Sequence, residues 1–212
     1  MKNGERAAME RPVREAVERL ERLQEMVLEK QTFRGFSGRA RAAGGLLALL
    51  AAAAMASGLA PRTVPAHLAA WGAVLVAALA LNFGALAHAF LRDPSYRRTP
   101  ARMRPALDVV PPLAVGGGLT LALVGAGQHD LLFGAWMGCY GLAHLAARRA
   151  LPPANCAVGL FYLASAALQL LPSARGFLNP WPMALAFVPG ELAGGWILHA
   201  IRARPQPTES PA

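Results

Sequence analysis

The stretch WPMALAFVPGELAGGWILHAIRAR, residues 181–204, decides the fold, because it is apolar and long enough to cross a bilayer. One carboxylate, Glu191, lies near its middle, directly after Pro189 and Gly190. A charged side chain at membrane depth is costly and usually faces a protein interior or a water-filled cavity. The stretch therefore predicts a membrane helix packed among others, and Glu191 is the first candidate functional residue.

The whole chain of 212 residues has the composition of a membrane protein. Hydrophobic residues make up 55% of it, charged residues 16% and aromatic residues only 7%, so much of the apolar content is small or aliphatic. A net charge of +9 would suit nucleic-acid binding in a soluble protein. In a membrane protein, basic residues instead mark the cytoplasmic side. We therefore expect the lipid bilayer as the main partner and no direct binding of nucleic acid.

Six apolar segments, each close to the ~20 residues of a bilayer crossing, are separated by short connections. They cover residues 42–60, 67–91, 106–126, 131–147, 155–172 and 182–201. If each segment crosses the membrane, nineteen Lys and Arg residues fall on one side and only two, Arg62 and Arg175, on the other. The positive-inside rule then places both termini in the cytoplasm.

The predicted fold is thus all-α, a polytopic protein of the bacterial cytoplasmic (inner) membrane. We expect an N-terminal cytoplasmic region over residues 1–41, a six-helix transmembrane domain over residues 42–204 and a disordered cytoplasmic tail over residues 205–212. Arg34, Arg39 and Arg41 are interpreted as marking the cytoplasmic edge of the first membrane helix.

An amphipathic helix is predicted before the membrane domain, over residues 1–34. Its apolar residues follow a 3-4-3-4 spacing over two heptads: Val13, Ala16, Leu20, Leu23 and Val27. Two heptads are short for a self-sufficient coiled coil. The stripe is therefore expected to dock on the chain's own cytoplasmic loops, on a protein partner or on a second copy of the chain.

Two interpretations of Glu191 are open. Pro189 removes a backbone hydrogen bond and is expected to kink the last helix beside the carboxylate, which is one way to build an ion or proton site. Alternatively, Glu191 is protonated or hydrogen-bonded to a neighbouring helix and only fixes packing. Gly190 and Gly194 form a small-xxx-small face that favours close helix contact.

Three histidines close alternate segments at similar predicted depth: His88, His144 and His199. If the helices converge, three imidazoles could hold a metal ion or ligate haem. Alternatively, they are polar residues at helix C-termini, where the helix dipole favours them. No His-x3-His or Cys-x2-Cys spacing supports a metal site, and we predict neither a metal nor a cofactor.

The third segment opens with DVVPPLAVGGG, residues 108–118. Asp108 lies near a predicted helix N-terminus, where a carboxylate is stabilised, and it is a further candidate for ligand or proton binding. Pro111 and Pro112 fit the first turn of a helix. The glycines that follow indicate either a hinge in a broken transporter helix or ordinary close packing.

Several short patterns resemble a group of bacterial six-helix integral membrane proteins with no known activity. The matching positions are Met26, Glu29, Phe33 and Gly38; Trp136, Tyr140 and Gly141; Pro153, Gly159 and Phe161; and Phe187, Gly190, Leu192, Gly195 and Arg202. The resemblance implies six membrane helices and no particular site residues. Genes of this group often lie beside a winged-helix regulator, which would imply a regulatory or sensing role.

No phosphate loop, nucleophile elbow, zinc-protease motif or catalytic carboxylate pair is present in the sequence, so an enzyme is less expected than a binding protein. The leading functional hypothesis is a sensor or accessory subunit whose cytoplasmic helix engages a partner. The alternative is a small ion- or proton-coupled transporter that uses Glu191.

Overall fold

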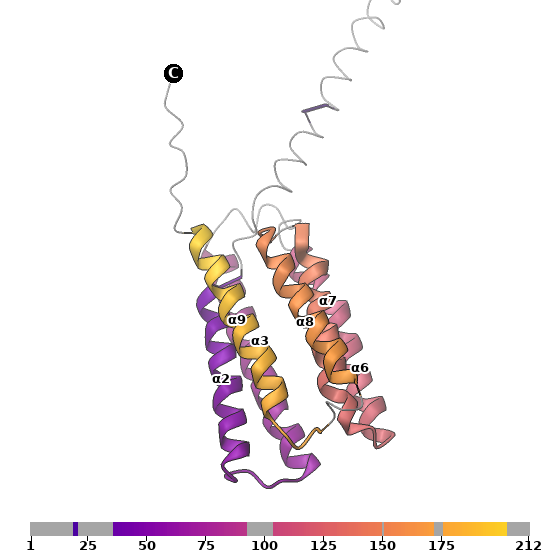
Figure 1. Cartoon of the computed structure of the whole chain (residues 1–212). Coiled ribbons are helices and arrows are strands. Elements are labelled where there is room, and N and C mark those ends of the chain that lie inside the picture. Colours follow the sequence, from indigo (N-terminus) through magenta and orange to yellow (C-terminus); the bar gives the residue numbers. More distant parts are fainter. Residues whose placement is uncertain (1–18, 21–35, 93–103, 150, 172–175, 203–212) are drawn as a thin grey trace, which may run out of the picture. The chain divides into compact units, whose positions relative to one another are not determined.

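The structure, a computed structural model, describes residues 19–20, 36–92, 104–149, 151–171 and 176–202. Within these ranges the regular structure is helical and contains no strand, which confirms the all-α fold class (Figure 1). The long helices are α2 (Gly38–Ala56), α3 (Val64–Arg92), α6 (Val110–Gly125), α7 (Leu132–Ala146), α8 (Ala154–Leu170) and α9 (Trp181–Arg202). Each corresponds to one of the six apolar segments of the sequence.

Short helical pieces extend two of these helices. The helix α5 (Arg104–Asp108) precedes α6, and the 3-10 helices η2 (His129–Leu131) and η3 (Ala147–Arg149) flank α7 without a break. The two prolines after Asp108 fall in the first turn of α6, where a missing backbone N–H costs nothing.

Within the described ranges, four helical stretches are long and apolar enough to cross a membrane: Gly38–Ala56, Val64–Arg92, Ala106–Gly125 and Trp181–Ala200. The helix α8 is apolar but shorter. The first of the four begins earlier than the sequence pattern suggests, because the Ser37 hydroxyl accepts a hydrogen bond from the Ala40 backbone N–H at 3.3 Å and caps α2. Arg41 therefore lies within the first turns of α2.

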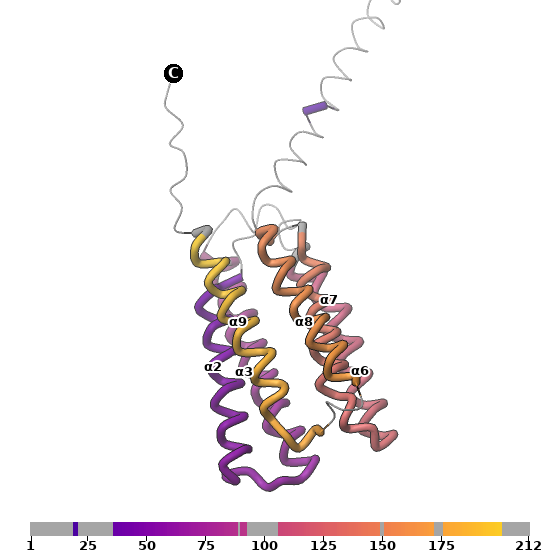
Figure 2. The backbone as a smooth tube through the Cα atoms, in the orientation of Figure 1, coloured from indigo at the N-terminus to yellow at the C-terminus, as the bar shows by residue number. Residues whose placement is uncertain are grey.

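The helices pack in two groups of three. In one group α2 contacts both α3 and α9, and in the other α7 contacts both α6 and α8; the packing of α8 on α9 joins them (Figure 1). Following the chain in Figure 2, α2 and α9 lie side by side although they are the first and the last of the six long helices described above.

Glycines allow the closest helix contacts. A Cβ added to Gly195 of α9 would lie only 2.7 Å from the carbonyl oxygen of Gly38 in α2. A Cβ on Gly141 of α7 would lie 2.9 Å from the carbonyl oxygen of Gly159 in α8. Real Cβ atoms avoid such distances, so both crossings require glycine, as close helix contacts in membranes often do.

An aromatic core fills the space between the start of α3, the start of α7 and the loop before α9. The Phe133 ring lies 5.9 Å from Trp71, 6.0 Å from Trp136 and 5.1 Å from Phe177, measured between ring centroids. Tilted and edge-to-face pairs at these distances stabilise beyond their buried area. This core therefore holds α3 and α7 together at one end of the bundle.

Candidate functional site: a buried ion-pair cluster

The most polar part of the described interior is an ion pair between Arg41 of α2 and Glu191 of α9. Both residues are buried, with 5% and 2% of their surface exposed. Arg41 Nε donates to Glu191 Oε2 at 3.1 Å, and Arg41 Nη2 donates to Oε1 at 2.8 Å. This is a bidentate pair, the arrangement that best matches the guanidinium fork to a carboxylate.

Two tyrosines from the second helix group complete the surroundings of the carboxylate. The hydroxyl of Tyr140 in α7 donates to Glu191 Oε1 at 2.9 Å, and the hydroxyl of Tyr162 in α8 lies 3.1 Å from the same oxygen. The Tyr162 hydroxyl also lies 3.2 Å from the carbonyl oxygen of Phe187. Glu191 is thus contacted from three other helices.

His144 and Asn155 bind the other side of the guanidinium. Asn155 Oδ1 accepts from Arg41 Nη1 at 3.0 Å, and His144 Nε2 lies 2.7 Å from Arg41 Nη2. Because a guanidinium only donates, Nε2 must accept. The proton of a neutral His144 then resides on Nδ1, which lies 3.0 Å from the carbonyl oxygen of Tyr140. We call these six residues the ion-pair cluster: Arg41, Tyr140, His144, Asn155, Tyr162 and Glu191.

Two glycines of α9 make room for this cluster. A Cβ on Gly194 would overlap the guanidinium group of Arg41, and a Cβ on Gly190 would overlap the hydroxyl of Tyr162. Their spacing from Glu191 places all three on the buried side of α9, where they are one turn apart or less. The sequence PGELAGG therefore supplies a carboxylate together with the space that its partners need.

The interactions within the cluster hold its helices together. One cation and one carboxylate neutralise each other, and their hydrogen bonds join α2, α7, α8 and α9. Removing one member of a buried ion pair leaves an uncompensated charge, which is far more costly than the pair itself. Any motion that separates the two helix groups must therefore break several of these bonds together.

The structure brings together only some of the predicted site residues. Glu191 and His144 are in the cluster, whereas the side chains of His88 on α3 and His199 on α9 are exposed. Among the described residues no group of three or more His, Cys, Asp or Glu side chains could hold a metal ion. Asp108 is exposed at the end of α5 and lies outside the cluster.

Pro189 lies inside α9, which continues through it to Arg202. The predicted kink at Pro189 and Gly190 stays a prediction, but the lack of a side chain at Gly190 makes room for the hydroxyl of Tyr162.

Of the N-terminal stripe, only Leu20 is within the described residues, where it is helical and 58% exposed. The other members, Val13, Ala16, Leu23 and Val27, lie outside the described residues, as does the tail from residue 205.

The sequence interpretation missed the partners of Glu191. Arg41 was taken as a marker of the membrane edge, whereas the structure places it in the interior. A carboxylate in an apolar segment needs a cation or several donors, and Arg41 directly precedes an uninterrupted apolar run. These two features of the sequence could have indicated that Arg41 pairs with Glu191. Nothing in the spacing of Tyr140, Asn155 and Tyr162 indicated that they would join the pair.

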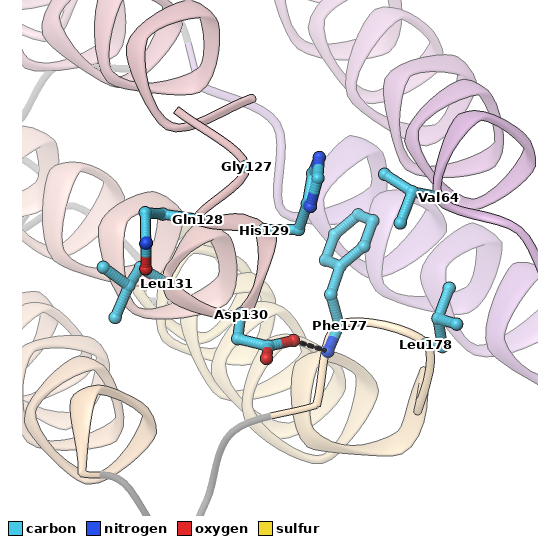
Figure 3. A pocket seen from close by; sticks show the side chains of 8 residues that line it. All are labelled: Val64, Gly127, Gln128, His129, Asp130, Leu131, Phe177 and Leu178. Carbon is cyan, nitrogen blue, oxygen red and sulfur yellow. Dashed lines mark hydrogen bonds between the residues drawn. The ribbon is translucent and has the colours of Figure 1, made fainter. Parts of the chain in front are cut away.

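A cleft of about 600 Å³ lies beside the cluster, between α3 and α6. Its walls are mostly apolar, and Arg41, Tyr140 and His144 contribute to its polar part. A smaller pocket of about 200 Å³ lies where the loop after α6 meets Val64 and the segment before α9 (Figure 3). There Asp130 Oδ1 accepts a hydrogen bond from the Phe177 backbone N–H at 2.9 Å, which ties the two loops together.

In the part of the chain that the structure describes, fold and site define an all-helical protein with four helices that could cross a membrane and a buried ion-pair cluster between its helices. No family model matches the chain. No curated protein and no solved structure matches it either.

Proposed function

We propose that the protein is a non-enzymatic sensor or accessory subunit of the bacterial cytoplasmic membrane, with six membrane spans and a partner bound through its N-terminal helix. The observation that carries this proposal is the position of Arg41. It is the fourth residue of α2, immediately after the N-terminal segment, and it is hydrogen-bonded to α7, α8 and α9. The first membrane helix therefore responds to any rearrangement of the other three.

Helix lengths support six spans. The continuous helical run formed by η2, α7 and η3 is about 34 Å long, at 1.5 Å per α-helical residue and 2.0 Å per 3-10 residue. The 17 residues of α8 measure about 26 Å. Both are close to the ~30 Å of a hydrocarbon core. With six spans, the strong bias of Arg and Lys to one side supports cytoplasmic termini.

Partner binding is tested by pull-down from native membranes in mild detergent. Leu20→Glu combined with Leu23→Glu introduces two negative charges into the apolar stripe, and capture of a partner or of a second copy should be lost. Arg22→Glu changes the net charge by the same amount on the opposite face of the helix, so it should leave capture intact. Unchanged capture and stability with the double variant would refute the proposed role of the stripe.

A small ion- or proton-coupled transporter is the second candidate, because Arg41, Tyr140 and His144 line the cleft beside Glu191. In this case Arg41 must leave Glu191 in each cycle, since the carboxylate has no free face in the closed cluster. Glu191→Gln should then abolish uptake or a proton-coupled signal while the protein is still produced. Unchanged transport in that variant would exclude this mechanism.

A further inference from the structure

The closest described helix crossings lie within the two three-helix groups rather than between them. In the first group, which contains α2, α3 and α9, the backbones of α2 and α9 meet at Gly38 and Gly195. In the second group, which contains α6, α7 and α8, the backbones of α7 and α8 meet at Gly141 and Gly159. Between the groups, the closest packing of the described long helices is that of α8 on α9. Close-packed crossings resist deformation, so each group is built to move as one body.

The buried ion pair belongs wholly to the first group, since Arg41 is on α2 and Glu191 is on α9. The side chains that bind the pair come from α7 and α8 of the second group: Tyr140, His144, Asn155 and Tyr162. Separation of the groups would therefore leave the cation with its carboxylate and break only bonds to neutral side chains. Water can replace these bonds at a small net cost, whereas unpairing a buried charge is expensive.

The cluster lies close to one end of α2, α7 and α8. Arg41 is the fourth residue of α2, His144 is the third from the end of α7 and Asn155 is the second residue of α8. Water at this end therefore has a short path to the bonds that separation would break. The described apolar cluster at the same end is small. Its buried residues are Ala147, Leu151 and Leu198.

The opposite end of the groups is held by the aromatic core, where water cannot replace the contacts. Phe133 of the second group packs on Trp71 and Phe177, which belong to the first group. These rings are part of a larger buried core to which α2, α3, α7, α8 and α9 all contribute. Surfaces that part without a new neighbour lose their dispersion contacts outright. The aromatic core is therefore the end at which the groups stay together.

We propose that the two groups rotate about the aromatic core and the α8–α9 packing, and that this rotation opens and closes the ion-pair cluster. In the open arrangement, water separates Arg41 and Glu191 from the side chains of α7 and α8. One intervening water adds one hydrogen-bond length, about 3 Å. Phe133 and His144 are about 16 Å apart along α7, so the rotation is about 10°, similar in size to known rotations of packed subunits. The motion carries the start of α2 away from α7 and α8, so it is the regulated step of the proposed sensor function, on which this assignment rests.

The motion is measured as distances between spin labels, by pulsed electron paramagnetic resonance. The full-length chain without its native cysteines is labelled in lipid nanodiscs. Labels at His88 and Asp108 give a cluster-end distance between the groups, and labels at Ala69 and Ala126 give an aromatic-end distance. In each pair the first label is on α3 and the second is beside one end of α6. All four residues are exposed, so the labels fit without disturbing the packing.

The perturbation is the double variant Tyr140→Phe/Tyr162→Phe, which removes two hydrogen bonds between the groups and keeps the ion pair. The population with a longer cluster-end distance, by about 3 Å, should rise at least about tenfold, because the carboxylate then gains by contact with water. The aromatic-end distance should stay at its parent value. The matched control is Thr120→Val, which removes the hydroxyl that binds Trp136 Nε1 within the second group. It should leave both distances unchanged.

Two results would overturn the proposal. A cluster-end distance that stays at the parent value in the folded double variant would show that these bonds do not hold a closed arrangement, and an equal increase at both ends would remove the aromatic core as the pivot. If the double variant does not fold, Asn155→Ala replaces it with the same expectations, since it removes a bond between Arg41 and α8. Both distances lie within the helical bundle, so they are read independently of partner capture. Opening without any change in capture would support the motion and contradict the sensor function alone.

Discussion

Replacement of Glu191 by Gln tests the ion-pair cluster most severely. The carboxylate accepts two hydrogen bonds from Arg41 and is contacted by the hydroxyls of Tyr140 and Tyr162. An amide retains one oxygen, places an NH₂ group against these donors and leaves the cation unpaired. Breaking a buried pair in this way costs about 3–5 kcal/mol of unfolding free energy. The Arg41→Met variant, which leaves the anion unpaired, should lose a similar amount.

The double variant Arg41→Met/Glu191→Gln distinguishes an ion pair from two independent contacts. It contains no buried charge, so it should be no less stable than either single variant, and the cycle should show a coupling free energy of at least about 2 kcal/mol. Unfolding is followed by circular dichroism during titration with a denaturing detergent. Phe133→Ala, in the distant aromatic core, should add to Glu191→Gln within about 0.5 kcal/mol. If the losses of unfolding free energy caused by Arg41→Met and Glu191→Gln were additive in the double variant, the two residues would not act as an ion pair and this account of the cluster would be refuted.

Three further outcomes are expected. Gly194→Ala should destabilise the protein by about 1–3 kcal/mol, because its Cβ would overlap a guanidinium group, whereas Gly118→Ala in open space should be neutral in the same unfolding assay. Tyr162→Phe removes one hydroxyl from a buried carboxylate and should reduce the unfolding free energy by about 1–3 kcal/mol; an unchanged value would mean that this hydrogen bond is not formed. In a chain without its native cysteines, a cysteine at Ser57 should react with an impermeant maleimide from outside the cell, and labelling only after lysis would contradict the six-span topology.

The apolar segments of the sequence predicted each of the long helices in the described part of the chain, because the length of an apolar run is a local property. The start of α2 was placed too late, since Ser37 and the first four residues of the helix, which include Arg39 and Arg41, gave no apolar signal. The prolines at the start of α6 were placed correctly, because their preference for the first turn is also local.

The cluster was only half predictable. Glu191 is recognisable from its own segment, since a carboxylate at this depth needs a partner. The identity of the partners depends on which helices pack together, and the sequence does not encode this locally. Arg41 is 150 residues away along the chain, and its entry into the interior requires the close α2–α9 crossing at Gly38 and Gly195. In the sequence alone, nothing distinguishes Tyr140 from an aromatic residue at a membrane interface.

We propose that a rearrangement of the helices joined by the cluster changes partner binding, and partner capture tests this proposal most directly. The measurement is a pull-down in mild detergent. It compares how much partner, or how much of a second copy of the chain, is recovered with the parent protein, with the Glu191→Gln variant and with the Phe133→Ala variant. The two variants should lose similar stability, about 3–5 kcal/mol each. Capture should fall with Glu191→Gln and persist with Phe133→Ala. Full capture by the Glu191→Gln chain would contradict the claim.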